Sequence, residues 1–559
     1  MKLSPRIALL AAVFLSVAAV KGPAQERSYG RSMVVTPFGI VATNSVQASQ
    51  AGARILERGG SAVDAGIAAN AVLGVVEPMM NGIGGDLFAI YWEARTRKLY
   101  GLNASGWAPL GLTPDHLRQK GITAMPQFGI DSVTVPGAVD GWTKLHARFG
   151  KLPWAELFTP AIIFADHGFA VPEMIHGYWD AAAPVLKNDP ESVRVYLEDG
   201  RAPALGQIFR NPELASSLRM IATRGEDAFY KGEIATAILK TSAELGGTMT
   251  AADLGDYSAE WVEPVSTTYR GWKVYELPPN GDGIAALEML NIMEQSQADA
   301  AGPLSTAELH TRIEAMKLAY ADVKAYDGDP KFAKIPVDEL LSKAYAAKRA
   351  ALIDPARANC TVAPGALGGS DTTYLSVVDK DGNILSLIQS NYQEFGSGVT
   401  VRGMGFALQD RGALFSLDPK SPDVLAGRKR PFHTIIPGFM EHGDQHIGFG
   451  IMGGMNQPLA HAQFVSNMVD YHMNIQEALD TARFTVSRKL GCNIVIENRV
   501  PADVRDQLTK MGHVLDVRKQ FSTAMGRGQA VLMDTETDMH YGASDPRADG
   551  VAEPELPPM

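Results

Sequence analysis

Hydrophobic and polar positions divide the chain into a long helix-rich part and a shorter part in which strand patterns dominate. Before residue 326, apolar residues recur mostly at intervals of three and four, the spacing of amphipathic helices. The helices that this spacing predicts are 49–58, 62–76, 137–149, 154–167, 211–224, 232–245 and 306–325. Two short apolar runs, 87–92 and 100–103, are instead typical of buried antiparallel strands.

The pattern changes between residues 326 and 371, where prolines and glycines interrupt any regular spacing. We expect this stretch to be a connecting arm. Strand patterns follow at 374–379 and 384–390, joined by a turn at Lys380-Asp381-Gly382-Asn383. Further helices are predicted at 457–473 and 475–483. Both halves together indicate an α/β fold in which helices are layered over antiparallel sheets.

Composition and charge fit a soluble globular protein. Of the 559 residues, 46% are hydrophobic and 20% are charged, and the formal net charge is −11 at pH 7. This length suggests more than two domains or one large α/β body. The negative balance disfavours nucleic acid and anionic membrane surfaces as partners.

The first 24 residues have the features of a signal peptide. Lys2 and Arg6 precede an apolar run at 7–20, and Gly22-Pro23-Ala24 supplies small residues for a cleavage site. The apolar run is too short to span a bilayer comfortably, and no later segment offers a longer one. We therefore expect a periplasmic or secreted protein whose mature form contains no membrane segment.

Thr372 is the strongest candidate for a catalytic residue. Within Asp371-Thr372-Thr373, it stands directly before the first strand of the predicted hairpin. If the bond between Asp371 and Thr372 is cut, the new α-amine of Thr372 becomes the general base for its own hydroxyl, so that no histidine or aspartate partner is needed. Threonine at the start of a strand is common for reasons of propensity alone, so this hypothesis depends on the rest of the chain.

A glycine-rich segment at 448–453 matches G-x-G-x-x-G, and Asp470 follows at roughly the spacing of a dinucleotide site. Asp470 lies in a helical pattern, however, whereas a dinucleotide fold needs its acid at the tip of a second strand. A better interpretation is that Gly453 and Gly454 form a bend whose backbone N–H groups make an oxyanion hole.

Neither the histidines nor the cysteines form a metal signature. His442 and His446 flank Gly443-Asp444, which predicts a turn and not one face of a helix. The two cysteines, Cys360 and Cys492, lack the spacing of a zinc knuckle. In an exported chain they could pair, and would then join the two products of a cut before Thr372. We expect no metal and no cofactor.

Assembled in order, these segments resemble the γ-glutamyltransferase (glutathione hydrolase) family of N-terminal nucleophile hydrolases over nearly all of the mature chain. The strongest likeness is at 372–383, which is close to the TTHxSVVDxxGN pattern around the nucleophile of the family. Further collinear matches are Asn81-Gly82-Ile83-Gly84-Gly85, Val135-Pro136-Gly137, Phe395-Gly396-Ser397-Gly398, Arg430-Pro431, Gly453-Gly454 and Tyr541-Gly542-Ala543-Ser544-Asp545-Pro546-Arg547.

The resemblance implies a four-layer αββα sandwich with antiparallel sheets, and a proenzyme that cuts itself between Asp371 and Thr372. A large subunit, 25–371, and a small subunit, 372–559, would stay associated. Thr372 would attack an amide carbonyl to form an acyl-enzyme, with Gly453 and Gly454 as the oxyanion hole. Ser390 stands where the family has a threonine that hydrogen-bonds the nucleophile.

The departures from the family pattern fall on residues expected to bind the substrate. Arg411 and Leu414 stand where the family has a glutamine and an amine-binding aspartate. Tyr392 replaces an acceptor asparagine, and His433-Thr434 replaces a pair of serines. Ser105 lies where family members use an arginine for the substrate carboxylate.

These departures predict which acyl group is accepted. Arg411 offers a fork suited to a carboxylate, and without an acid at position 414 a substrate ammonium would lose its partner on burial. We expect an acyl group with a free carboxylate but no essential α-amine, as in glutaryl- or oxamate-like amides. The alternative is a structural Arg411, with another residue binding the amine.

The segment 416–430 is shorter than the lid loop of the family, which favours an open site and hydrolysis over transfer. The expected function is cleavage of glutathione-like γ-glutamyl amides or related carboxylate-bearing acyl amides. A non-catalytic binding protein on the same fold is a rival, although binding alone would need neither Thr372 nor Ser390. An NAD-dependent enzyme would need the dinucleotide site rejected above.

Overall fold

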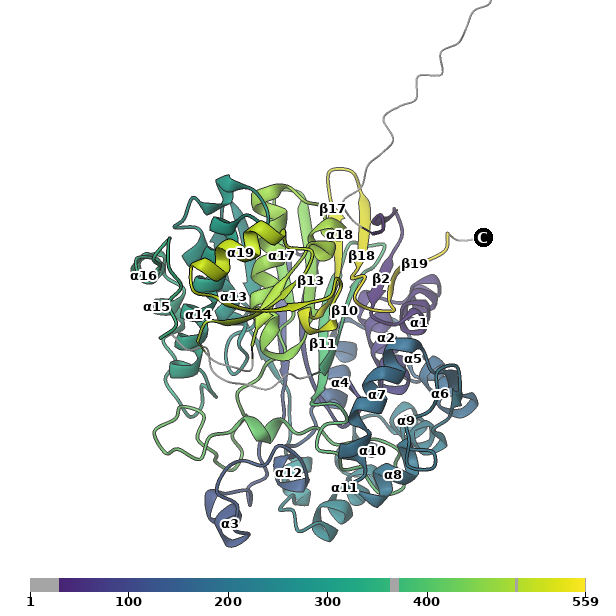
Figure 1. Ribbon diagram of the computed structural model, residues 1–559. Coiled ribbons are helices and arrows are strands. Elements are labelled where there is room, and N and C mark those ends of the chain that lie inside the picture. Colours follow the sequence, from purple (N-terminus) through teal and green to yellow (C-terminus); the bar gives the residue numbers. More distant parts are fainter. Residues whose placement is uncertain (1–29, 362–370, 488–490, 558–559) are drawn as a thin grey trace, which may run out of the picture.

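Two seven-stranded sheets lie face to face at the centre of the molecule, and helices cover both outer faces (Figure 1). The computed structural model describes residues 30–361, 371–487 and 491–557, so the expected signal peptide lies outside the described residues. All strand pairs within the two large sheets are antiparallel. The predicted four-layer αββα sandwich is confirmed.

One sheet, called the nucleophile sheet below, contains the predicted hairpin. Its strands, in spatial order, are β19 (Val551–Pro554), β2 (Ile40–Thr43), β10 (Asp371–Val378), β11 (Ile384–Tyr392), β3 (Asp86–Glu93), β4 (Lys98–Ala104) and β7 (Glu260–Val262). Every residue of β11 is buried, because this strand has a neighbour on each side and a layer against each face. That position explains why its polar side chains, among them Ser386 and Gln389, are buried together with its apolar ones.

The second sheet, called the facing sheet, packs against the nucleophile sheet through β13 and β17. Its strands, in spatial order, are β1 (Val34–Thr36), β18 (Met539–Ser544), β17 (Arg527–Asp534), β13 (Gln445–Met452), β12 (Gly438–His442), β9 (Trp272–Glu276) and β8 (Val265–Tyr269). Two small sheets complete the strands of the described residues: β14 (Phe484–Val486), β15 (Asn493–Glu497) and β16 (Val514–Arg518), and β5 (Phe169–Ala170) with β6 (Ile208–Phe209).

Helices α1 (Val46–Glu57), α2 (Ala62–Val76) and α4 (Ala138–Phe149) pack on the nucleophile sheet. Helices α13 (Gly283–Met293), α17 (Gln457–Tyr471) and α18 (Ile475–Asp480) pack on the facing sheet, with α14 (Thr306–Tyr326) against α13. The other α-helices are α3 (Pro114–Gln119), α5 (Trp154–Leu157), α6 (Thr159–His167), α7 (Glu173–Leu186), α8 (Pro190–Tyr196), α9 (Pro212–Arg224), α10 (Asp227–Tyr230), α11 (Glu233–Glu244), α12 (Ala251–Gly255), α15 (Val337–Leu340), α16 (Lys343–Ala350) and α19 (Ala502–Lys510). Short 3₁₀ turns are η1 (Ile130–Ser132), η2 (Ala298–Ala301), η3 (Arg411–Leu414), η4 (Gly454–Asn456) and η5 (Thr523–Met525).

Two expectations need correction in detail. The single helix expected at 154–167 is two helices, α5 and α6, because Pro160 has no N–H to continue the hydrogen bonds of the first turn. The arm between α14 and β10 contains two short helices, α15 and α16, in addition to loop. Within the described residues, no helix has both the length and the apolar character needed to cross a membrane.

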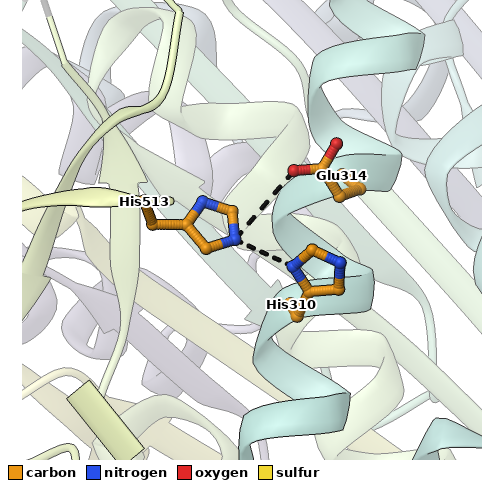
Figure 2. A group of neighbouring side chains, drawn as sticks. All are labelled: His310, Glu314 and His513. Carbon is orange, nitrogen blue, oxygen red and sulfur yellow. Dashed lines mark hydrogen bonds and ion pairs between the residues drawn. The ribbon is translucent and has the colours of Figure 1, made fainter. Parts of the chain in front are cut away.

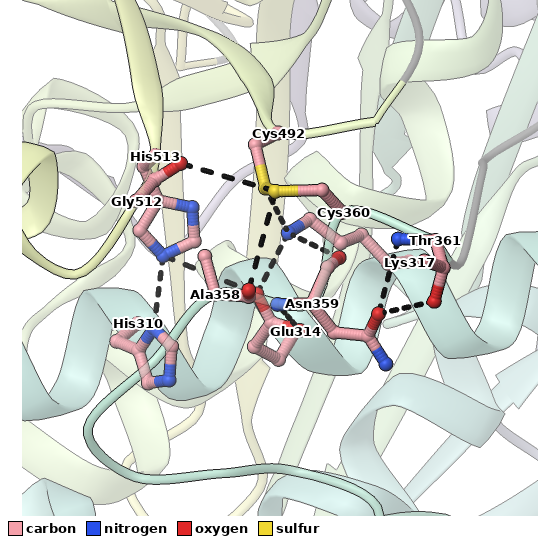
Figure 3. The surroundings of a disulfide bond; sticks show 10 residues. All are labelled: His310, Glu314, Lys317, Ala358, Asn359, Cys360, Thr361, Cys492, Gly512 and His513. Atoms are coloured by element: carbon pink, nitrogen blue, oxygen red, sulfur yellow. Dashed lines mark hydrogen bonds and ion pairs between the residues drawn. A yellow bond between two sulfur atoms is a disulfide. The ribbon is translucent and has the colours of Figure 1, made fainter.

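A disulfide joins Cys360, in the arm, to Cys492, directly before β15 (Figure 3). The two Cα atoms are 4.8 Å apart although 132 residues separate them in the sequence. Cys360 precedes the expected cut at Asp371-Thr372 and Cys492 follows it. The disulfide therefore links the two parts of the chain that cutting would separate.

Candidate active site

Thr372 is fully buried at the head of β10, beside the neighbouring strand β11. Its hydroxyl donates a hydrogen bond to the Ser390 hydroxyl oxygen, at 3.1 Å between Oγ1 and Oγ. The same Ser390 oxygen accepts the backbone N–H of Tyr392 at 2.8 Å. The β10–β11 pairing shifts register between Asp371 and Thr373, so Thr372 lies at an irregular point of the ladder. Its side chain is thereby oriented by Ser390 and not by a regular strand partner.

The facing sheet brings a glycine bend towards the same strand end. The Ser376 hydroxyl of β10 donates to the Gly448 carbonyl of β13 at 3.0 Å. Two residues nearer the start of β10, the Tyr374 ring lies so close to Gly450 that an added Cβ would meet it at 2.4 Å. Thr372 is the next residue in this alternation towards the start of β10, and Gly453 and Gly454 directly follow β13.

Gly453 and Gly454 have the left-handed backbone that glycine favours, with φ values of 136° and 58°. They begin the 3₁₀ turn η4, and N–H groups at the start of a helical turn have no acceptor within it. Such a pair of N–H groups can bind an oxyanion. The bend is therefore suited to the role that the sequence predicted for it.

Arg411 is completely buried and is the first residue of η3. Its Nη1 donates to the Thr434 hydroxyl at 2.8 Å, and the guanidinium carbon lies 4.5 Å from the centre of the Tyr392 ring. The two other nitrogens, Nε and Nη2, have no hydrogen-bond partner among the described residues. A buried guanidinium with two unused donors is suited to a carboxylate ligand.

His433 and Asp86 form a buried pair beside this guanidinium. His433 Nε2 lies 3.0 Å from Asp86 Oδ2, and the Ile435 N–H approaches His433 Nδ1 at 3.5 Å, so Nε2 carries the proton of a neutral ring. Burial, followed by the charges of Arg411 and Arg430, holds the pKa of His433 well below its ordinary value. Burial raises the pKa of Asp86 to about 7, against the opposing charge of Arg411.

Asp86 was not singled out from the sequence. It ends the glycine loop that was noted only for its likeness to the family, and one of its oxygens accepts the Gly106 N–H at 2.9 Å. Ser105, one residue before Gly106, hydrogen-bonds Asn103 at 2.7 Å and lies 3.4 Å from Arg430. The signal that could have found Asp86 is an acid at the first position of a strand whose residues are buried almost throughout.

A cavity of about 560 Å³ lies next to these residues. Three of the residues that line it are neighbours of site residues in the sequence. Leu414 ends the turn that begins with Arg411, Met455 follows Gly454, and Phe432 precedes His433. Tyr320 also lines it and donates its hydroxyl proton to the Met455 carbonyl. Its charged lining residues are Lys324, Asp327, Asp418, Lys420 and Asp423.

The structure leaves the other motifs without a role in this site. Residues 448–452 belong to β13 and Asp470 belongs to α17, where it accepts the Tyr269 hydroxyl at 2.7 Å, so the segment has no dinucleotide geometry. His442 pairs with Gln445 across the β12–β13 turn, as the sequence predicted for a turn.

A separate polar group, His310, Glu314 and His513, lies where α14 approaches the segment before β16 (Figure 2). His310 Nε2 is 2.8 Å from the Asp354 carbonyl, so it carries the proton, and Nδ1 accepts from His513 Nε2 at 2.8 Å. Lys317 donates to Glu314 at 2.7 Å, and its positive charge disfavours a second cation at the same carboxylate. The group forms a hydrogen-bonded chain within the core.

Comparison with known proteins agrees with this geometry. The sequence profile of the family described as gamma-glutamyltranspeptidase matches residues 48–555. The chain is 37% identical to the glutathione hydrolase-like YwrD proenzyme of Bacillus subtilis over 93% of its own length and 98% of that protein. It is 33% identical to the oxamate amidohydrolase proenzyme of Klebsiella pneumoniae over 93% of its length and 98% of that protein.

Among solved structures, a cephalosporin acylase from Bacillus halodurans is similar, with a TM-score of 0.88 and 41% identity. The likeness covers 95% of this chain and 98% of that one. Family profile, relatives and fold thus agree over nearly the whole chain. The chain belongs to the γ-glutamyltranspeptidase family of self-processing amidohydrolases.

Proposed function

We propose that the chain cuts itself between Asp371 and Thr372, giving a large subunit, 25–371, and a small subunit, 372–559. The observation that carries this proposal is the contact between the Thr372 and Ser390 hydroxyls in a fully buried site. The Thr372 hydroxyl attacks the preceding carbonyl, the peptide C–N bond breaks to give an ester, and water then hydrolyses that ester. Thr372 is left with a free α-amine and a free hydroxyl.

In turnover, this α-amine takes the proton of the Thr372 hydroxyl as the oxygen attacks the amide carbonyl of the substrate. The N–H groups of Gly453 and Gly454 stabilise the oxyanion of the tetrahedral intermediate. The amine then passes the proton to the leaving nitrogen, and an acyl ester on Thr372 remains. Ser390 keeps the Thr372 oxygen aligned through the hydrogen bond between the two hydroxyls.

Arg411 recognises a carboxylate on the acyl group. Its two unused nitrogens supply the fork, while Thr434 and the Tyr392 ring hold the guanidinium in place. His433 is hydrogen-bonded to Asp86 and so helps to form the wall of the site beside Arg411. The substrate class is an amide of a carboxylate-bearing acyl group, with γ-glutamyl amides such as glutathione as the first candidate.

A glutaryl-type or oxamate-like amide is the second candidate. Leu414 favours it, because this residue lines the cavity where the family has an amine-binding acid. The names of two similar proteins, a cephalosporin acylase and an oxamate amidohydrolase, point the same way. The wide cavity beside the site favours water over a captured amine, so hydrolysis exceeds transfer. We further propose export to the periplasm or medium, directed by residues 1–24.

Mass spectrometry of the acyl-enzyme tests this function. Purified protein is mixed for short times with γ-glutamyl- and glutaryl-p-nitroanilide, and the small subunit is weighed. The expected result is a small subunit heavier by one acyl group, located on Thr372, and release of p-nitroaniline that Thr372→Ala abolishes. Full activity in Thr372→Ala would contradict the proposal.

A further inference from the structure

Asp282 is a buried acid that the mechanism above does not use. It caps the N-terminus of α13 and is fully buried. Neither of its carboxylate oxygens has a hydrogen-bond partner among the described residues. An unpartnered buried carboxylate is costly to the fold, so its presence calls for a ligand or a protonated state.

Backbone hydrogen bonds tie Asp282 to the segment that holds Arg411. The Asp282 N–H donates to the His433 carbonyl at 3.0 Å, and the His433 N–H donates to the Asn280 carbonyl at 2.7 Å. Thr434, the next residue, accepts the hydrogen bond from Arg411. Asp282 is therefore built into the wall of the proposed acyl site.

Burial and a neighbouring charge both act on the pKa of Asp282. Burial raises the pKa of Asp282 well above its ordinary value, and the charge of Arg411 opposes that rise. Burial raises the pKa of Glu276, of Tyr320 and of Asp327, and the charge of Asp282 adds to each rise. Tyr320 and Asp327 line the cavity beside Arg411. Asp282 is therefore in electrostatic reach of the guanidinium and of two residues that line the cavity.

Asp282 is an acid and Arg411 is a cation; both are buried, and they do not hydrogen-bond each other. Two unused guanidinium nitrogens and two unused carboxylate oxygens remain in one site. A ligand with a carboxylate and an ammonium group would satisfy all four at once. A ligand with a carboxylate alone would leave the acid unpartnered.

We propose that Asp282 determines specificity by binding the ammonium group of a zwitterionic acyl group whose carboxylate binds Arg411. This inference rests on the proposed function and decides between its two candidates. The absence of an acid at position 414 then no longer argues against recognition of an amine, because Asp282, at the start of α13, supplies the acid.

The test compares kcat/KM for γ-glutamyl- and glutaryl-p-nitroanilide, which differ only in the amine. We expect the wild type to prefer the γ-glutamyl compound. Asp282→Asn should lower kcat/KM for that compound by about 30- to 5,000-fold, the range measured when one partner of a buried charge pair is removed. For the glutaryl compound it should change kcat/KM by less than about threefold, since Asn keeps the volume and removes only the charge.

Asp418→Asn is the matched control, because Asp418 is an exposed acid at the rim of the same cavity. It should leave the ratio of the two kcat/KM values unchanged. Self-cleavage of Asp282→Asn reports whether the variant folds. If it does not fold, the wild-type ratio alone decides, since a wild-type preference for the glutaryl compound would overturn the proposal.

Other results distinguish failure of the Asp282 inference from failure of the proposed function. An equal loss for both compounds in Asp282→Asn would mean that Asp282 serves the carboxylate or the fold, and would overturn the inference while the amidase function stands. Failure of correctly cut wild type to hydrolyse either compound would overturn the inference together with the proposed substrate class.

Discussion

At the scale of single residues, the candidate site depends on a few buried atoms with defined partners. The Ser390 oxygen accepts both the Thr372 hydroxyl and the Tyr392 N–H, which fixes its position relative to the nucleophile. Arg411 and Asp282 keep unused polar atoms in the interior, where such atoms normally find partners. The proposed roles of both residues depend on these unused atoms, because a bound ligand would supply their partners.

Ser390→Ala should slow both self-cleavage and turnover by about 10- to 100-fold, the value of one hydrogen bond to a group that becomes charged. Ser390→Thr is the control and should retain most of the rate, since it keeps a hydroxyl on the same carbon. The rates are measured from the fraction of cut chain over time and from kcat for p-nitroanilide release. Equal rates in Ser390→Ala and wild type would show that the contact is not used.

Arg411→Lys should lower kcat/KM for carboxylate-bearing amides by about tenfold, because a lysine keeps the charge but loses the two-pronged geometry. Arg411→Gln should lower it by about 100-fold or more. The lower kcat/KM should come mainly from a higher KM, while the rate constant of self-cleavage stays close to that of the wild type. An unchanged KM in Arg411→Gln would mean that the guanidinium is structural.

At the scale of elements, the sequence predicted α2 to the residue and most amphipathic helices to within a few residues. It missed α13, because every residue of that helix is buried and no polar face gives it a period. Asp86 and Asp282 were missed for a related reason. Both lie at the ends of elements, and their roles arise from partners hundreds of residues away in the sequence, such as His433.

Glu77, the residue that ends α2, gives a prediction on stability. Burial raises its pKa to about 8, although Asn44 donates a hydrogen bond to it. The folded state therefore binds a proton more tightly than the unfolded state does, and this contribution to stability is lost as pH rises from about 4.5 towards 8. Glu77→Gln cannot lose a proton, so it should lack this part of the pH dependence.

Thermal unfolding at pH 5 and pH 8.5 measures the effect. The variant and the wild type should have similar Tm values at pH 5, and the variant should be the more stable at pH 8.5, by a few kcal/mol at most. A variant that is less stable than the wild type at pH 8.5 would show that burial does not raise the pKa of Glu77.

At the scale of the whole molecule, the two expected subunits form one body. In the nucleophile sheet, β10 and β11 of the small subunit lie between β2 and β3 of the large one, and in the facing sheet β9 of the large subunit pairs with β12 of the small one. Each core layer is therefore built from both parts. The disulfide between Cys360 and Cys492 adds a covalent link on the outside of this shared core.

The disulfide predicts the behaviour of the cut protein on denaturing gels. Without reductant, the two subunits should migrate as one species, because Cys360 and Cys492 lie on opposite sides of the cut. With reductant, or in Cys360→Ser, two species should appear. The native size of Cys360→Ser should be unchanged, since the sheets still join the subunits. Two species from wild type without reductant would show that the bond does not form.

The central claim is that Thr372 is an N-terminal nucleophile made by self-cleavage. Intact-mass measurement and N-terminal sequencing of the purified wild type, under reducing conditions and beside Thr372→Ala, test it most directly. The account predicts two fragments from the wild type, the smaller beginning at Thr372 and ending at residue 559, and one uncut chain from the variant. A folded wild-type chain that stays uncut, or a cut at another bond, would contradict it.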